Sequence, residues 1–162
     1  MSKMSKINKI DRMTFWLLSI TIIVHISLFI INLFSFFKEV PMSKAFDIKD
    51  GVFYYLVCFI IQSLLAVVIS ILILKFLKAI NNKDIFNSLN IDYIFHSSMF
   101  LIVYIAIENI KSIVDIEPND IELLSTTPYT STLLIMIAIV MQHFVFIYKE
   151  SKSIKEENDL TI

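Results

Sequence analysis

The sequence predicts an all-α integral membrane four-helix bundle, built as a single membrane domain over residues 1–162, and three observations predict it. Apolar residues make up 57% of the chain and charged residues only 18%, against about 45–50% and about 25% in soluble proteins. The mean hydropathy is +0.76. Long stretches rich in isoleucine, leucine and phenylalanine recur along the chain, and they lack the apolar–polar alternation of a transmembrane barrel.

The first expected transmembrane helix covers residues 13–37, a stretch without formal charge. A helix rises about 1.5 Å per residue and the hydrocarbon core is about 30 Å thick, so this stretch is long enough to cross a bilayer. It is also longer than the apolar region of a signal peptide. We therefore expect an uncleaved helix here rather than a leader.

The second expected helix covers residues 52–74, which are also uncharged, and Lys75 and Lys78 follow it. Lysine side chains at a helix end can reach the membrane surface while their methylene groups stay in the apolar layer. This pattern predicts a spanning helix that ends at the interface.

The third expected helix, residues 91–108, is shorter, because Asp92 and Glu108 bound its uncharged part. Bilayer thinning and packing against neighbouring helices accommodate a short span at modest cost. The fourth, residues 129–148, begins and ends with a tyrosine, a residue type that collects at membrane–water interfaces. The sequence thus predicts four spans.

The basic residues predict which side of the membrane each loop faces, because lysine and arginine are retained on the cytoplasmic side. The amino-terminal segment has four of them, and the second loop and the carboxy-terminal tail have three each. The first loop has three and the third loop has one, Lys111. Both termini are therefore expected in the cytoplasm, which requires an even number of spans.

The third loop is expected to be acidic. It contains one lysine, Lys111, and five acidic residues: Glu108, Asp115, Glu117, Asp120 and Glu122. Such a surface can attract cations or cationic peptides, although a solvated loop kept poor in basic residues would have the same composition.

Three polar residues of the first span form a candidate intramembrane polar face: Thr21, His25 and Asn32. Their spacing places them on one side of a helix with about 3.6 residues per turn. Polar groups in a membrane helix usually face protein. The simplest interpretation of this face is a packing surface.

The second span carries a stripe of small residues, Ser63, Ala66 and Ser70. Small side chains let a neighbouring helix approach closely, so the stripe predicts a helix–helix contact. Cys58 is the only cysteine, and we interpret it as a small apolar residue packed within the helix.

His96 and His143 are expected near the cytoplasmic ends of the third and fourth helices, where a hydrogen-bonded or proton-sensitive pair can form. The chain has no phosphate-binding glycine loop, no HExxH motif and no GxSxG motif. We therefore expect no enzymatic activity, no cofactor and no metal site. Direct nucleic-acid binding is not expected either, because the basic residues form short, scattered clusters.

The last eight residues read Lys-Glu-Glu-Asn-Asp-Leu-Thr-Ile. In this ending, in its length and in its four-span plan, the chain resembles a bacterial membrane-protein family, domain of unknown function 2975. The second loop, residues 80–90, is also similar to the family's pattern at Ile80, Phe86 and Asn90, with Asn87 at the expected cap. Lys83 stands where the family has glycine and Ile85 where it has proline.

The resemblance implies a bacterial cytoplasmic membrane and no known catalytic activity. Members of the family often occur beside small helix-turn-helix regulators, which implies a regulatory or stress-related role. The leading hypothesis is a non-enzymatic membrane protein that engages a cytoplasmic helix-turn-helix regulator through its second loop and tail. The docking residues would be Glu156, Glu157, Asp159, Leu160 and Ile162.

The alternative hypothesis is a small transporter or an antimicrobial-peptide immunity or resistance protein. It would use the acidic third loop and the polar helix faces. The lipid bilayer is the partner that composition itself predicts. The sequence leaves the oligomeric state open.

Overall fold

The structure is a computed structural model that describes the backbone of residues 3–81 and 88–159, and the side chains within 15–79 and 89–144. Its four long helices are α1 (Lys3–Glu39), α3 (Gly51–Asn81), α4 (Ser88–Lys111) and α6 (Thr127–Asp159). Two short helices, α2 (Met42–Ala45) and α5 (Pro118–Leu123), lie in the connections. No strand occurs within the described ranges, and the predicted all-α four-helix bundle is confirmed.

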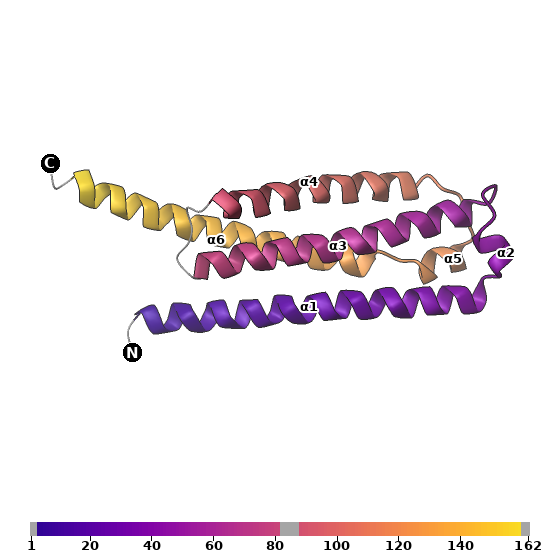
Figure 1. Cartoon of the computed structure of the whole chain (residues 1–162), viewed down its shortest axis with the longest axis horizontal. Coiled ribbons are helices and arrows are strands. Elements are labelled where there is room, and N and C mark those ends of the chain that lie inside the picture. The colour runs from indigo at the N-terminus through magenta and orange to yellow at the C-terminus, as the bar shows by residue number, and fades with distance from the viewer. Residues whose placement is uncertain (1–2, 82–87, 160–162) are drawn as a thin grey trace.

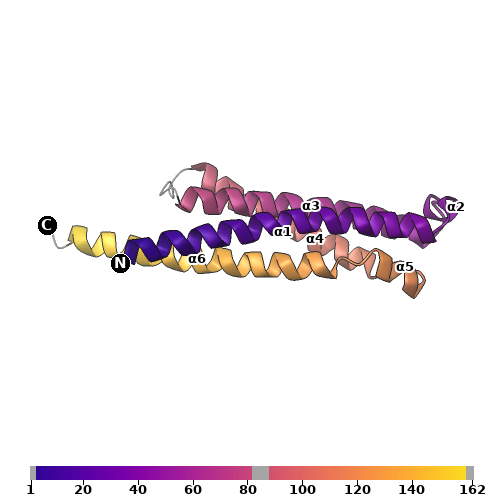
Figure 2. The same cartoon turned by 90° about the horizontal axis from the view of Figure 1, so that it is seen from below.

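The four long helices lie side by side and alternate in direction, as Figures 1 and 2 show. The start of α1 and the end of α6 therefore lie at the same end of the bundle, and α2 and α5 lie at the other (Figure 1). We call these the terminal end and the capped end. The central helix is α3, because it contacts α1, α4 and α6.

Four stretches of the described chain are long and apolar enough to cross a membrane: Phe15–Glu39, Gly51–Ala79, Leu89–Lys111 and Pro118–Phe144, of which the last runs from α5 into α6. The third is longer at both ends than the expected 91–108. The charge of Glu108 does not end it, because the carboxylate bonds within the bundle, and the stretch ends at Lys111.

A continuous buried stripe on α3 forms the centre of the core. Its apolar members recur at steps of three and four residues, the spacing of one helix face: Val52, Tyr55, Leu56, Phe59, Ala66, Ile69, Ile73, Phe76 and Leu77. Gln62, Ser63 and Ser70 lie in the same stripe and are also buried. The small-residue stripe is therefore a packing surface, as predicted.

One flank of the bundle is formed by α1, which turns much of its apolar surface outward. Its buried residues include Leu18, His25 and Phe36, whereas Ile23 and Phe34 are exposed. In a bilayer such outward side chains contact lipid, so they need no protein partner. The inward stripe of α1 is accordingly narrow. A polar residue in this stripe therefore makes up a large share of the contacts that hold α1 to the bundle.

Candidate functional site

A buried polar network joins α3, α4 and α6 near the capped end. It begins in the last turn of α4, where Glu108 and Lys111 are three residues apart and so lie on the same side of the helix. That side faces the bundle, and Lys111 is only 3% exposed. Charged groups inside a membrane bundle are costly unless they are paired, so their partners decide what this network can do.

The ammonium of Lys111 binds a carbonyl, a hydroxyl and an aromatic ring. Nζ donates to Leu124 O at 2.8 Å and to Thr126 Oγ1 at 3.2 Å. It also lies 4.4 Å from the centre of the Tyr55 ring, which is within the range of a cation–π contact. Leu124 follows the end of α5, where helix carbonyls lack partners within the helix. Lys111 therefore fixes the α5–α6 junction to α4.

The carboxylate of Glu108 accepts hydrogen bonds from Gln62 Nε2 at 2.6 Å and from Thr126 Oγ1 at 2.9 Å. The Thr126 hydroxyl accepts from Lys111 and donates to Glu108, and it thus bridges two opposite charges. Thr126 directly precedes α6, so the carboxylate lies at the amino-terminal end of that helix. The helix dipole favours negative charge there.

Gln62 and Tyr104 extend the network between helices. Gln62 Nε2 also donates to Tyr104 O at 3.3 Å, and the Tyr104 hydroxyl bonds to Thr130 Oγ1 at 2.9 Å. Both Gln62 and Tyr104 are buried. The network therefore ties α3 and α4 to the first turn of α6 through hydrogen bonds shielded from bulk water.

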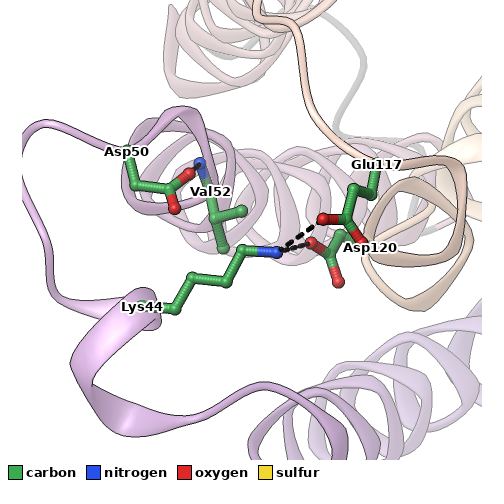
Figure 3. Close-up of polar contacts among 5 residues, drawn as sticks. All are labelled: Lys44, Asp50, Val52, Glu117 and Asp120. Atoms are coloured by element: carbon green, nitrogen blue, oxygen red, sulfur yellow. Dashed lines mark hydrogen bonds and ion pairs between the residues drawn. The ribbon is translucent and has the colours of Figure 1, made fainter.

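A second group of charges lies at the capped end between α2 and α5 (Figure 3). Lys44 Nζ of α2 donates to Asp120 Oδ2 at 3.0 Å and to Glu117 Oε1 at 3.4 Å. The hydrogen bond to Asp120 is the main cause that raises the pKa of Lys44, so the ammonium stays charged. Asp120 is buried, and the ion pair holds α2 against α5.

A cavity of about 420 Å³ opens beside this ion pair. Its lining residues are Lys44, Asp50, Val52, Asp115, Ile116 and Glu117. Three carboxylates thus face the cavity against one ammonium, and that ammonium is already paired. The cavity is therefore acidic, with two aliphatic side chains completing its wall.

Asp50 and Gly51 shape the side of the cavity that α3 forms. Asp50 Oδ1 accepts the Val52 N–H at 3.0 Å, which satisfies one of the amides left unpaired at a helix start. Gly51 permits a close approach, because a β-carbon there would lie 2.7 Å from Asp115 O. The start of α3 can therefore pack directly on the 114–116 segment, which brings Asp115 to the same cavity as Asp50.

The charged residues of the expected acidic third loop lie in three different environments. Glu108 and Lys111 belong to α4 and face the interior, so the expectation that they lie in the loop is wrong. Asp120 is paired with Lys44, whereas Asp115 and Glu117 line the cavity. The charges that remain available to a ligand are therefore fewer than the sequence suggests, and they are gathered in one place.

His25 is the member of the predicted polar face that reaches furthest into the bundle. It is fully buried, Nε2 bonds to Thr132 Oγ1 of α6, and the ring meets Tyr129 edge-on with centroids 5.1 Å apart. The Thr21 hydroxyl donates to a carbonyl of its own helix at 3.0 Å. Asn32 is half-buried.

The predicted docking tail lies at the end of α6. The helix continues to Asp159, so Glu156, Glu157 and Asp159 occupy its last turns. Leu160 and Ile162 lie outside the described residues, as do positions 82–87 of the second loop.

His96 and His143 each bond within their own helix. His96 Nδ1 lies 2.7 Å from Asp92 O, and His143 Nδ1 lies 2.8 Å from Ile139 O. Among the described residues, no three histidine, cysteine, aspartate or glutamate side chains are grouped to hold a metal ion.

Sequence reasoning missed Gln62, Lys111 and Thr126 as members of the buried network. The sequence could have indicated Gln62, because it is the one amide side chain in the uncharged 52–74 stretch and an amide in a membrane helix needs a partner. It could also have indicated Lys111, since this residue follows Glu108 at helical spacing. Nothing in the sequence indicates Thr126, because its partners come from distant parts of the chain.

No protein-family model, curated protein or solved structure matches the chain. Membership of the family that the sequence resembles therefore stays a prediction. The acidic cavity and the buried network are the features from which a function can be argued.

Proposed function

We propose that the protein is a non-enzymatic, multi-pass membrane protein that binds a cationic ligand at its capped end. The acidic cavity is the observation that carries this proposal. Asp50, Asp115 and Glu117 line it. Its one cation, Lys44, is already paired with Glu117 and Asp120. Of the two functions that the sequence suggests, this geometry favours a small transporter or an antimicrobial-peptide immunity or resistance protein.

Charge and size both suit an organic cation. Two unit charges about 4 Å apart attract each other by about 4 kcal/mol at an effective dielectric constant of about 20, and a concave site focuses the field. The volume of about 420 Å³ falls within the range of about 300–1,000 Å³ typical of small-molecule sites. Val52 and Ile116 offer apolar contact for the carbon chain of an alkylammonium or guanidinium group.

Binding can be tested on the full-length protein in lipid nanodiscs with two peptides of equal length, one lysine-rich and one glutamate-rich. The lysine-rich peptide should bind, and rising salt should weaken its affinity by screening. Asp115→Asn should weaken that binding roughly tenfold, which corresponds to about 1.4 kcal/mol.

Asp47→Asn is the matched control, because Asp47 is an exposed carboxylate of the same end that does not line the cavity. Equal losses in the two variants would contradict the proposal, since they would reflect net charge alone. Binding of the glutamate-rich peptide with similar affinity would contradict it as well.

The two roles for a cation site differ in their consequences for a cell. Deletion of a transporter should change the accumulation of a cationic solute. Deletion of an immunity protein should instead increase sensitivity to cationic peptides. An Asp115→Asn strain should reproduce part of whichever phenotype appears, and a strain that behaves as wild type despite a clear deletion phenotype would separate that phenotype from the cavity.

Docking of a cytoplasmic helix-turn-helix regulator is the second candidate function, and the length of α6 favours it. The helix continues past residue 148, where the sequence predicts that the span ends, to Asp159, a further distance of about 16 Å at about 1.5 Å per residue. Figure 1 shows this part of α6 projecting past α3 and α4. A projecting helix can present Glu156, Glu157 and Asp159 to a soluble partner.

Pull-downs with the full-length protein and with a chain ending at Lys152 test this second candidate. The full chain should capture a soluble regulator that the shorter chain does not. Both forms should insert into the membrane equally, because the truncation leaves every spanning stretch intact. Identical sets of captured proteins would refute a docking role for the end of α6.

We further propose a bacterial cytoplasmic membrane location with both termini in the cytoplasm. The positive charges flanking the helices support this sidedness, and the placement of the ends of α1 and α6 at one end of the bundle supports an even number of spans. Reporter fusions after Lys49 and Asp120 should read as external, and fusions after Lys83 and Ile162 as cytoplasmic. A cytoplasmic signal at Asp120 would overturn the orientation.

A further inference from the structure

Among the residues whose side chains the structure describes, four buried polar atoms of the bundle interior have no hydrogen-bond partner: His25 Nδ1, Gln62 Oε1, Ser63 Oγ and Tyr129 OH. Their side chains are exposed by 2% or less. Buried polar atoms in folded proteins are almost always hydrogen-bonded, so a group of exceptions requires an explanation. None of the four atoms takes part in the acidic cavity.

The four side chains come from α1, α3 and α6, and contacts link three of them. The His25 ring meets the Tyr129 ring edge-on at 5.1 Å. The Ser63 hydroxyl interacts with the Tyr129 hydroxyl, although neither atom makes a hydrogen bond of ordinary geometry. Gln62 precedes Ser63 on α3. His25 lies about 21 Å along α1 from its end at Glu39, by the rise per residue, so the group is deep within the bundle.

His25 Nδ1 lacks a hydrogen-bond partner in either tautomer of the ring. Nε2 bonds to Thr132 Oγ1, and that hydroxyl also lies 2.9 Å from Pro128 O and from Tyr129 O. A neutral imidazole has one N–H group and one bare nitrogen. Nδ1 is therefore an acceptor without a donor when Nε2 carries the hydrogen, and a donor without an acceptor when Nδ1 carries it.

The hydrogen-bond partners of the Gln62 amide determine its orientation. Two acceptors, Glu108 Oε2 and Tyr104 O, lie within hydrogen-bond distance of the atom assigned as Nε2. Only the NH₂ group can satisfy both. Oε1 is therefore the end of the amide that points away from them, and it is an acceptor without a donor.

We propose that the α1/α3/α6 contact contains a water-binding site formed by His25, Ser63 and Tyr129, with Gln62 at its edge. Gln62 Oε1 needs a donor, the two hydroxyls need acceptors for their hydrogens, and His25 Nδ1 needs one or the other according to its tautomer. Water both donates and accepts, so it can serve groups of both kinds. An ammonium or metal ion accepts nothing, and it would leave both hydroxyl hydrogens unpaired.

Such a site changes how α1 is held. The inward stripe of α1 is narrow, and its apolar contacts through residues such as Leu18 and Phe36 are limited in number. Bound water would add hydrogen bonds from α1 to both α3 and α6 at the middle of that stripe. The docking of α1 would then depend on hydration as well as on apolar packing.

X-ray radiolytic labelling of the full-length protein in nanodiscs tests the proposal, because hydroxyl radicals formed from bound water modify the side chains beside it. Tyr104 is the matched control: it is a buried tyrosine like Tyr129, but its hydroxyl is hydrogen-bonded to Thr130. Tyr129 should be labelled several-fold faster than Tyr104. Equal rates, or no labelling of Tyr129, would overturn the site.

Melting temperatures give a second measurement with a predicted sign. In a dry site, Tyr129→Phe and Ser63→Ala remove polar atoms that lack partners, so each should leave the melting temperature unchanged or raise it. In a water-binding site each change removes a bond to water, and each should lower the melting temperature by roughly 2–4 °C. An unchanged or raised melting temperature in both variants would refute the proposal.

Discussion

Replacing Lys111 with methionine tests the claim that this lysine fixes the α5–α6 junction to α4. Methionine has a similar length and no charge, so it keeps most of the packing and removes the ammonium. The change leaves the Leu124 carbonyl without the donor that lies 2.8 Å away, and it leaves Glu108 in the interior without the cation on the other side of Thr126.

Opposing contributions determine how much stability the Lys111→Met change removes. A hydrogen bond to a charged group contributes about 1.5–3 kcal/mol, and a desolvated cation–π contact such as that with Tyr55 contributes about 2 kcal/mol. Avoiding the desolvation of an ammonium offsets part of this loss. A buried carbonyl left without its donor costs about 1–3 kcal/mol, and we expect Lys111→Met to lose about 3 kcal/mol in all.

Thermal unfolding in detergent micelles measures the effect. For a chain of this size, about 1 kcal/mol shifts the melting temperature by about 2–4 °C, so the variant should melt roughly 10 °C lower. Lys49→Met is the control, because Lys49 is exposed at the same end. Adding Glu108→Gln should recover part of the loss, since the uncompensated carboxylate is then gone. A Lys111→Met protein with the same melting temperature as the Lys49→Met control would refute the reasoning.

Three further predictions concern the capped end and α1. Gly51→Ala should lower the melting temperature, because its β-carbon would lie 2.7 Å from Asp115 O and overpacking costs about 1–3 kcal/mol; an unchanged value would show that the segment can move aside. Lys44→Gln tests a pH dependence. The bond to Asp120 raises the pKa of Lys44, so its stabilisation is fully present below the ordinary value of 10.5 and is lost as the pH rises through the raised value. Wild type should therefore melt above the variant near neutral pH and converge with it in strong alkali; a gap that persists in alkali would exclude this ion pair as the cause. His25→Leu should leave membrane insertion intact, because leucine is easier to place within a bilayer, and loss of the protein from the membrane fraction would contradict this.

The sequence by itself determined the fold class and the number of spans. Transfer into a bilayer depends on the summed hydrophobicity of consecutive residues, and this is a local property that can be read along the chain. The uncharged stretches at 13–37 and 52–74 therefore predict α1 and α3 well. The predicted end of a span was less accurate where a charged residue lies near that end. The third span continues past Glu108 to Lys111, because the Glu108 carboxylate has hydrogen-bond partners inside the bundle.

Only the tertiary structure decided which polar residues meet. His25 of α1 bonds to Thr132 of α6, and Gln62 of α3 bonds to Glu108 of α4. Whether such partners meet depends on how far each helix is rotated about its axis and shifted along it. Those two quantities follow from side-chain packing across the whole bundle. The acidic cavity arises in the same way, because Asp50 and Asp115 meet only where the 114–116 segment packs on the start of α3 at Gly51. Hydropathy contains no information about such encounters, since it is the same for every rotation of a helix.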